Sequence, residues 1–344
     1  MHTRIPATVI TGFLGAGKTT LIRHILENAG GRRIALIVNE FGDVGVDGEL
    51  LRGCGDAACG EDDIVELANG CICCTVADEF IPTMTRLLKR DAPPEHIIIE
   101  TSGLALPQPL IRAFNWPEIR ARVTVDGVIT VADAPALAAG QFAADPRKVE
   151  LLRQADVNLD HESPLHELFE DQIRAADMIL LNKADLVDDQ TLARLKDELA
   201  SQARAGVRVL SCQHGRIDPA ILLGLGAAAE DDTRPTHHEL AGEADHDHDE
   251  FVTFAVNSGA WPSREELLAR VDEVLRAHPV LRLKGFAALA GKPARLLVQA
   301  VGRRAQAWFD RPWQADETPA TRLVVIGLKG LDEEAVRNAL SKQP

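Results

Sequence analysis

The feature that most constrains the fold is a glycine-rich segment enclosed by a short apolar run and a helical one. The letters GFLGAGKT match G-x-x-x-x-G-K-[ST] from Gly12 to Thr19. They follow the β-branched run ATVIT directly and lead into a predicted helix from Lys18 to about Asn28. Between a strand and a helix this pattern is typical of a P-loop, whose backbone N–H groups and helix N-terminus converge on a polyphosphate. The sequence therefore predicts a nucleotide-binding α/β domain.

The chemistry of the loop assigns roles to its residues. We expect the Lys18 ammonium to reach the β- and γ-phosphates and to act in catalysis, and the Thr19 hydroxyl to ligate Mg²⁺. The alternative, a chance glycine-rich turn, is disfavoured by the flanking strand and helix. The predicted nucleotide contacts of this segment are Gly12, Gly15, Ala16, Gly17, Lys18, Thr19 and Thr20.

Short apolar runs without polar interruptions recur after the loop. They are RIALIVNE, HIIIETSG, VDGVITVAD and MILLNKAD. Strands that are apolar on both faces and separated by helices indicate a parallel sheet covered on both sides. We therefore predict a doubly wound, mostly parallel α/β domain, a P-loop GTPase fold, over residues 1–230.

The composition changes near residue 230. The stretch EDDTRPTHHELAGEADHDHDE is densely acidic, lacks apolar periodicity and is predicted to be a linker over residues 231–250. Beyond it, the strand-like runs FVTFAVNS, LRLKGFAALA, ARLLVQAVGRRAQAWFD and TRLVVIGL accompany two helical segments. Ser263 is the expected N-cap of the first of these helices. Residues 251–344 are predicted to form a small α+β domain.

A second motif indicates which nucleotide binds. LLNKAD places Asn182, Lys183 and Asp185 at the end of a predicted strand, and N-K-x-D is the guanine-reading signature of GTPases. An Asp carboxylate can accept hydrogen bonds from guanine N1–H and from its exocyclic amine, which adenine cannot supply. Sites that depend on such bonds discriminate strongly. We therefore expect these three residues to bind GTP.

Acidic and glycine residues between the two motifs complete the predicted nucleotide site. Glu100 ends the strand HIIIE, where it can ligate Mg²⁺ and orient the attacking water, and Gly103 can let the backbone approach the γ-phosphate. The segment NEFGDVGVD (residues 39–47) is a candidate switch I, ordered by γ-phosphate and Mg²⁺ and released on hydrolysis, with Glu40 as a further Mg²⁺ ligand. The alternative is that its acids are simply solvated.

Three of the six cysteines, Cys71, Cys73 and Cys74, crowd into GCICC. The N-terminal stretch lacks the features of a signal peptide and no apolar run reaches the ~18 residues that span a bilayer, so we expect a cytoplasmic protein with reduced thiols. A bridge between adjacent Cys73 and Cys74 would also be strained. A metal site, a redox switch and an inert buried cluster remain, and thiolates suit tetrahedral Zn²⁺ or Co²⁺. The formal charge of −15 disfavours nucleic acid and anionic membranes as partners.

In their order along the chain, the P-loop, GCICC, E-x-x-G and N-K-x-D resemble the CobW-type GTPases, a family of nucleotide-dependent metal chaperones. The resemblance implies slow GTP hydrolysis coupled to release of an ion held by the three cysteines. The CGDAAC segment ahead of GCICC is most similar to the cobalt-linked branch, which implies Co²⁺ delivery to a client such as a cobaltochelatase in aerobic cobalamin synthesis. The alternatives are Zn²⁺ delivery to a client metalloenzyme, and a regulatory switch GTPase with structural or redox cysteines.

A further set of cysteines and histidines lies outside GCICC. Cys54 and Cys59, spaced as C-x4-C, are either auxiliary metal ligands or loop residues. The linker histidines either bind metal weakly or belong to a solvated acidic spacer. Cys212 and His214, in SCQHG, are predicted to be residues of a loop that packs near the guanine base. The linker histidines are His237, His238, His246 and His248.

Overall fold

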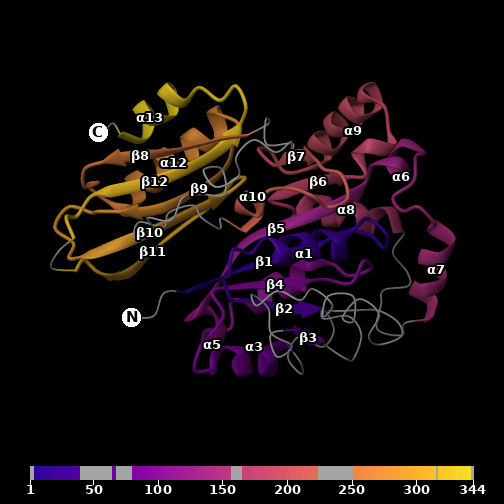
Figure 1. Ribbon diagram of the computed structural model, residues 1–344, viewed down its shortest axis with the longest axis horizontal. Coiled ribbons are helices and arrows are strands. Elements are labelled where there is room, and N and C mark those ends of the chain that lie inside the picture. Colours follow the sequence, from indigo (N-terminus) through magenta and orange to yellow (C-terminus); the bar gives the residue numbers. More distant parts are fainter. Residues whose placement is uncertain are drawn as a thin grey trace. The chain divides into compact units, whose positions relative to one another are not determined.

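The computed structural model describes residues 4–38, 64–66, 80–155, 165–223, 251–314 and 317–341 (Figure 1). The chain divides into two compact units, Arg4–Pro219 and Ala220–Pro344. The domain limits at residues 230 and 250 stay a prediction, because residues 224–250 lie outside the described part of the chain.

The first unit is built on a seven-stranded sheet in the order β3-β2-β4-β1-β5-β6-β7, and all of its strand pairs are parallel. Every residue of β2, β4 and β6 is buried, which explains why their sequences are unbroken apolar runs. The predicted doubly wound parallel sheet is confirmed. The strands are β1 (Ile5–Thr11), β2 (Ile34–Val38), β3 (Ile64–Glu66), β4 (His96–Glu100), β5 (Val123–Asp133), β6 (Met178–Asn182) and β7 (Arg208–Ser211).

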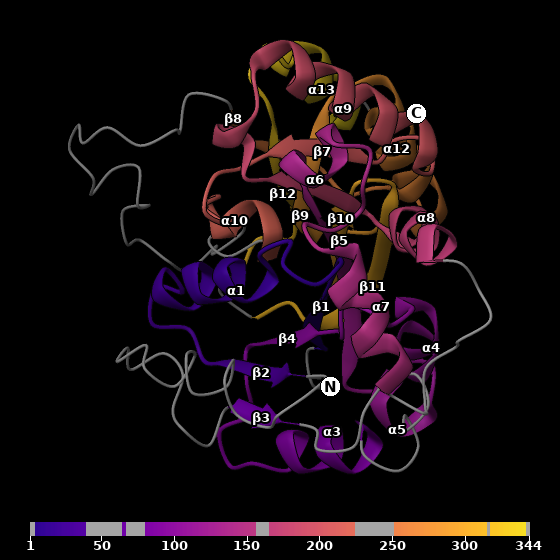
Figure 2. The same cartoon turned by 90° about the vertical axis from the view of Figure 1, so that its right-hand side faces the viewer.

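Helices cover both faces of this sheet; Figure 2 shows α1 on one face and α4 and α8 on the other. Helix α1 begins at Lys18, as predicted, and buries Leu21, Ile22, Ile25 and Leu26. On the opposite face α3, α4 and α5 share a core with β1, β2 and β4. The helices of this unit are α1 (Lys18–Glu27), α3 (Ile81–Leu88), α4 (Pro107–Ala113), α5 (Pro117–Arg120), α6 (Ala134–Ala138), α7 (Pro146–Ala155), α8 (Leu165–Ala175) and α9 (Asp189–Gln202), with a 3-10 turn η3 (Ala184–Leu186). The short helix α10 (Pro219–Leu223) begins at the last residue of this unit and belongs otherwise to the second one.

The topology places one edge of the sheet to bind a ligand. Strand β1 lies between β4 and β5; the chain leaves β1 towards β2 on one side, and leaves β4 towards β5 on the other. In open α/β sheets, ligands bind at the carboxyl ends of the strands where successive connections diverge in this way. The glycine-rich loop, Glu100 and the N-K-x-D segment all lie at or directly after the carboxyl ends of strands in this sheet.

The second unit contains a five-stranded antiparallel sheet in the order β11-β10-β9-β12-β8, and α12 and α13 pack into one core on this sheet. The predicted α+β domain is confirmed, and so is the cap: Ser263 Oγ accepts a hydrogen bond from Glu266 N at 3.1 Å. Among the described residues, none of the helices has the length and apolar character that crossing a membrane requires. The elements are β8 (Phe251–Ser258), α12 (Arg264–Ala277), β9 (Val280–Ala287), β10 (Ala294–Val301), β11 (Arg304–Pro312), β12 (Thr321–Leu328) and α13 (Glu333–Ser341).

One strand prediction needs refinement. The run ARLLVQAVGRRAQAWFD, predicted as a single strand-like segment, is a hairpin in which Val301 pairs with Arg304. Gly302 adopts φ 54°, a left-handed conformation that glycine supplies at low cost in tight hairpin turns. The glycine therefore divides the run into β10 and β11.

Candidate nucleotide-binding site

The glycine-rich loop between β1 and α1 is pressed against two neighbouring strands. Gly12 and Gly17 have φ of 136° and 104°, which side-chain-bearing residues rarely adopt. A Cβ atom on Gly12 would lie 2.1 Å from the Val131 carbonyl oxygen, and one on Gly17 would lie 2.2 Å from Nδ2 of Asn182. Both glycines are therefore required by conformation and by space.

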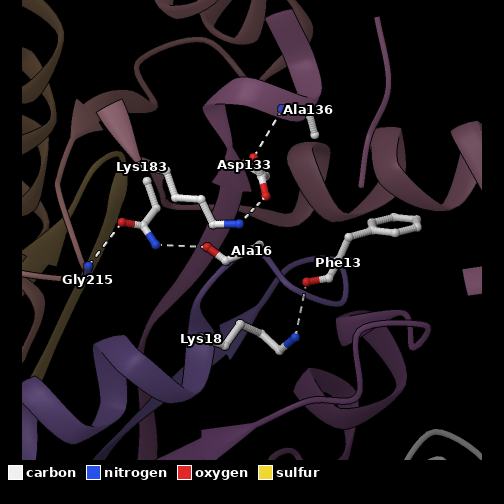
Figure 3. A network of polar contacts seen from close by, with 8 residues as sticks. Phe13, Ala16, Lys18, Asp133, Ala136, Lys183 and Gly215 are labelled. Atoms are coloured by element: carbon white, nitrogen blue, oxygen red, sulfur yellow. Dashed lines mark hydrogen bonds and ion pairs between the residues drawn. The ribbon is translucent and has the colours of Figure 1, made fainter. Parts of the chain in front are cut away.

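Lys18 bends back over this loop. Its Nζ donates to the carbonyl oxygens of Gly12 at 2.9 Å and Phe13 at 3.4 Å, and Figure 3 shows the contact with Phe13. Only 7% of the residue is exposed. A buried ammonium needs acceptors, which the loop carbonyls provide. The positive charge thus lies over the loop and at the N-terminus of α1, where a phosphate group would be attracted.

The two predicted Mg²⁺ ligands of the described chain contact each other. Thr19, in the first turn of α1 beside Thr20, donates its hydroxyl to Oε1 of Glu100 at 3.3 Å. Glu100 is the last residue of β4 and is 5% exposed. A hydroxyl and a carboxylate beside a phosphate-binding loop are the oxygen donors that Mg²⁺ prefers, so these residues fit the ion. Glu40 lies outside the described residues.

Asn182 ties the glycine-rich loop to a second loop. Its Nδ2 donates to the Ala16 carbonyl at 2.9 Å, and its Oδ1 accepts from the Gly215 backbone N–H at 3.0 Å. The Cys212 thiol donates weakly to the same Oδ1 at 3.4 Å. The side chain is buried, so both ends of the amide are used by protein groups. Predicted as a nucleotide contact, Asn182 acts in this structure as the link between the two loops.

Lys183 has a partner that the motif does not reveal. Its Nζ lies 2.5 Å from Oδ2 of Asp133, the residue that ends β5, and Figure 3 shows this pair beside the Ala16 contact. Asp133 is 2% exposed, and its Oδ1 also caps α6 by accepting from Ala136 N at 3.1 Å. The acid therefore holds the lysine in place next to the glycine-rich loop. Sequence inspection missed Asp133, although an acid two residues before Pro135 is a helix N-cap signal.

The remaining N-K-x-D residue lies in the turn η3 beside the loop after β7. Ala184 N donates to the Cys212 carbonyl at 3.1 Å, and Asp185 Oδ2 lies 3.9 Å from Nε2 of His214. Burial raises the pKa of the Cys212 thiol to about 12, so it stays neutral and is a poor metal ligand at neutral pH. Cys212 and His214 thus border the N-K-x-D segment, and their place near the guanine base stays a prediction. The Asp185 side chain keeps partial exposure, as a group that reads a base requires.

The predicted cargo site and its auxiliary ligands lie outside the described residues. Within the described ranges, no group of three or more His, Cys, Asp or Glu side chains could hold a metal ion. The structure therefore leaves the metal ligands as predictions. They are Cys54, Cys59, Cys71, Cys73, Cys74, His237, His238, His246 and His248.

Models of known protein families match both parts of the chain. Residues 6–210 match the CobW/HypB/UreG nucleotide-binding domain. The chain belongs to the CobW/HypB/UreG family. Residues 251–343 match the cobalamin synthesis protein cobW C-terminal domain, so both units of this CobW-type chain have counterparts. The family consists of P-loop GTPase metallochaperones, and the predicted enzyme class, a GTPase, is confirmed.

Individual relatives of this CobW-type chain are similar over nearly its whole length. Zinc chaperone CobW of a Sinorhizobium species is 60% identical over 342 residues, covering 98% of this chain and 97% of the relative. Zinc chaperone CobW of Pseudomonas aeruginosa is 55% identical over 345 residues, covering 98% and 91%. The crystal structure of Zn(II)-bound YjiA GTPase from E. coli is 28% identical, with 98% of each chain covered and a TM-score of 0.42.

We expect the Asp133→Asn variant to bind GTP and GDP more weakly by roughly tenfold, because one charge-assisted hydrogen bond to Lys183 is lost. Asparagine caps helices about as well as aspartate, so α6 should be kept. Isothermal titration with each nucleotide checks the expectation. Asp145→Asn is the matched control, since Asp145 Oδ1 accepts from Lys148 N at 3.0 Å, outside the site. Equal affinities in both variants would contradict the role of Asp133.

Proposed function

We propose that this chain is a GTP-dependent metal chaperone, which binds a divalent ion through Cys71, Cys73 and Cys74 and releases it to a client on GTP hydrolysis. The observation that carries the proposal is the register of three parallel strands. Val38 at the end of β2 pairs with both Glu66 of β3 and Glu100 of β4, so the three strands end level. The segment with the cysteines follows Glu66 and thus begins at the edge where Glu100 contacts Thr19.

GTP is held in this proposal by groups from both motifs. The loop backbone and Lys18 bind the phosphates, and Asp185 reads the guanine edge while Asn182 and Lys183 hold the surrounding loops. Thr19 and Glu100, with Glu40, would hold Mg²⁺, which supplies positive charge to the phosphate oxygens when bound. Glu100 orients the attacking water. The oxygen of this water attacks the γ-phosphorus as the bond between the γ-phosphorus and the β-phosphate oxygen breaks, which yields GDP and phosphate.

The names of the relatives support zinc as the ion that this chain carries. The two relatives at 60% and 55% identity are both named zinc chaperones. Thiolate sites also bind Zn²⁺ more tightly than Co²⁺ in the general affinity order. Cobalt is the second candidate, supported by the CGDAAC segment that is similar to the cobalt-linked branch. The client is a cytoplasmic metalloenzyme for zinc, or a cobaltochelatase for cobalt.

The test of the proposed function is metal affinity measured in two nucleotide states. We expect Zn²⁺ or Co²⁺ to bind the Mg²⁺-loaded protein roughly 5–150-fold more tightly with a non-hydrolysable GTP analogue than with GDP, the range of typical coupling between sites. By linkage the metal must tighten binding of the GTP analogue by the same factor. Competition against a chromophoric chelator gives both affinities.

The variant with all three of Cys71, Cys73 and Cys74 replaced by Ser separates the cargo site from the nucleotide site. It should lose the tight metal site and the coupling while GDP affinity stays unchanged. Equal metal affinities with GTP analogue and GDP in the unaltered protein would contradict the chaperone mechanism. That result would favour a regulatory switch GTPase with structural or redox cysteines.

A further inference from the structure

Gln172 of α8 is a buried polar residue that none of the sequence motifs includes. Its side chain amide faces the loop after β4: Nε2 lies 3.3 Å from the Gly103 carbonyl oxygen and 3.1 Å from that of Ala105. The residue is 0% exposed. One amide group therefore donates to two carbonyls of the loop after β4, which we call the E-x-x-G loop because the motif Glu100–Gly103 leads into it. The donor and the two acceptors are 69 and 67 residues apart in the chain.

The helix that carries Gln172 is itself fixed to the sheet. The hydroxyl of Thr130, a fully buried residue of β5, donates to the Gln172 carbonyl at 2.9 Å. The side chain thus projects from a backbone position that packing and a hydrogen bond both define. A group held in this way can impose its geometry on a loop instead of following it.

The loop held by Gln172 begins directly after Glu100, the predicted catalytic acid, and contains Gly103. Thr101 N donates to the Ile10 carbonyl at 2.9 Å, one residue after Glu100, so the start of the loop follows β1. At Gly103 an added Cβ would lie 2.6 Å from Leu14 N, so the loop lies directly on the glycine-rich loop. A shift of the Gly103 carbonyl would therefore move the backbone that is predicted to face the γ-phosphate.

The oxygen of the Gln172 amide does not take part in holding the loop. Its Oε1 is buried and, within the described part of the chain, accepts no hydrogen bond. Two carbonyl acceptors fix the NH₂ group on their side, so flipping the amide would place oxygen against oxygen. A buried acceptor without a donor is destabilising, and an apolar residue of similar shape would avoid that cost. A glutamine at this position is therefore explained by the two hydrogen bonds with which its NH₂ group holds the loop.

We propose that Gln172 is a positioning residue for GTP hydrolysis, which holds the E-x-x-G loop so that Glu100 and the Gly103 backbone face the γ-phosphate. The inference rests on the GTPase part of the proposed function and is independent of the metal carried. Gln172→Met keeps the length of the side chain and removes both donated hydrogen bonds. Because neutral hydrogen bonds contribute about 1 kcal/mol each, we expect kcat to fall roughly tenfold or more. Affinity for the GTP analogue should fall several-fold, while GDP affinity changes less than about twofold, because GDP lacks the γ-phosphate.

The control is Gln108→Met, because Gln108 Nε2 donates to the carbonyl of Asp171, also in α8, at 3.3 Å and not to a carbonyl of the loop after β4. Steady-state hydrolysis with Mg²⁺ and without cargo metal should match the unaltered protein. Gln172→Glu is the second variant: its carboxylate repels the two carbonyls at neutral pH, whereas the protonated acid can donate to one. Its kcat relative to the unaltered protein should therefore rise as the pH is lowered.

Two results would overturn the role of Gln172. One is an unchanged kcat in Gln172→Met, together with a flat relative pH profile for Gln172→Glu. The other is a loss of GDP affinity and thermal stability equal to the loss of kcat, as a purely structural residue gives. Metal affinities that are equal with GTP analogue and GDP would instead overturn the chaperone mechanism and leave this inference intact.

Discussion

The Lys18→Met variant is expected to lose nearly all GTP hydrolysis, with kcat/KM lower by roughly 10²–10³-fold, because it removes a charge placed where the transition state becomes more negative. Lys18 Nζ lies 2.9 Å from the Gly12 carbonyl, inside the phosphate-binding loop. Methionine has a similar length and keeps the apolar stem in place. Phosphate release from saturating GTP, followed with a coupled assay, measures the effect.

The structural cost of this change should be small. Removing the ammonium leaves the Gly12 and Phe13 carbonyls without one donor each, but it also removes a charge from a residue that is only 7% exposed. Lys148→Met, at an exposed position of α7, is the matched control and should hydrolyse GTP normally. Unchanged hydrolysis in Lys18→Met would show that the loop does not bind the phosphates of GTP.

The fold could be predicted where a local pattern and the final environment agree. Strands β2, β4 and β6 are buried on both faces, so their positions are visible as unbroken apolar runs. The same reasoning failed at Gly302, because strand-like residues on both sides conceal a turn only two residues long. The turn becomes evident only from the pairing of Val301 with Arg304, which sequence periodicity does not contain.

The site could be predicted only as far as its motifs are local. The glycine-rich loop and N-K-x-D act through neighbouring backbone, so their residues carry the signal themselves. Asp133 and Lys183 are 50 residues apart, and Gln172 and Gly103 are 69 apart. Contacts at such separations are set by the order of the strands in the sheet, which brings β5, β6 and the loop after β4 together. Asn182 shows a related limit, because a base-reading motif gave no sign that its amide joins two loops.

The Asp185→Asn variant is expected to lose GTP affinity by roughly 10²–10⁴-fold, because two hydrogen bonds to a charged group contribute about 1.5–3 kcal/mol each. The Asp185 carboxylate lies in the turn η3, which Ala184 N fixes to the Cys212 carbonyl at 3.1 Å. Asparagine would turn one N–H towards the guanine amine and leave that donor without an acceptor. Xanthosine triphosphate carries a carbonyl in place of the amine, so the variant should prefer it to GTP.

Asp188→Asn provides the matched control three residues away. Asp188 caps α9 by accepting from Thr191 N at 2.9 Å, and asparagine is an equally good cap, so nucleotide affinity should not change. Titration of both variants with GTP and xanthosine triphosphate then separates base reading from local stability. A reversal of preference in Asp185→Asn alone assigns guanine recognition to that carboxylate. Equal losses of affinity for both nucleotides in both variants would contradict this assignment. A disturbed turn weakens the binding of every nucleotide alike, whereas a changed hydrogen-bond pattern distinguishes between bases.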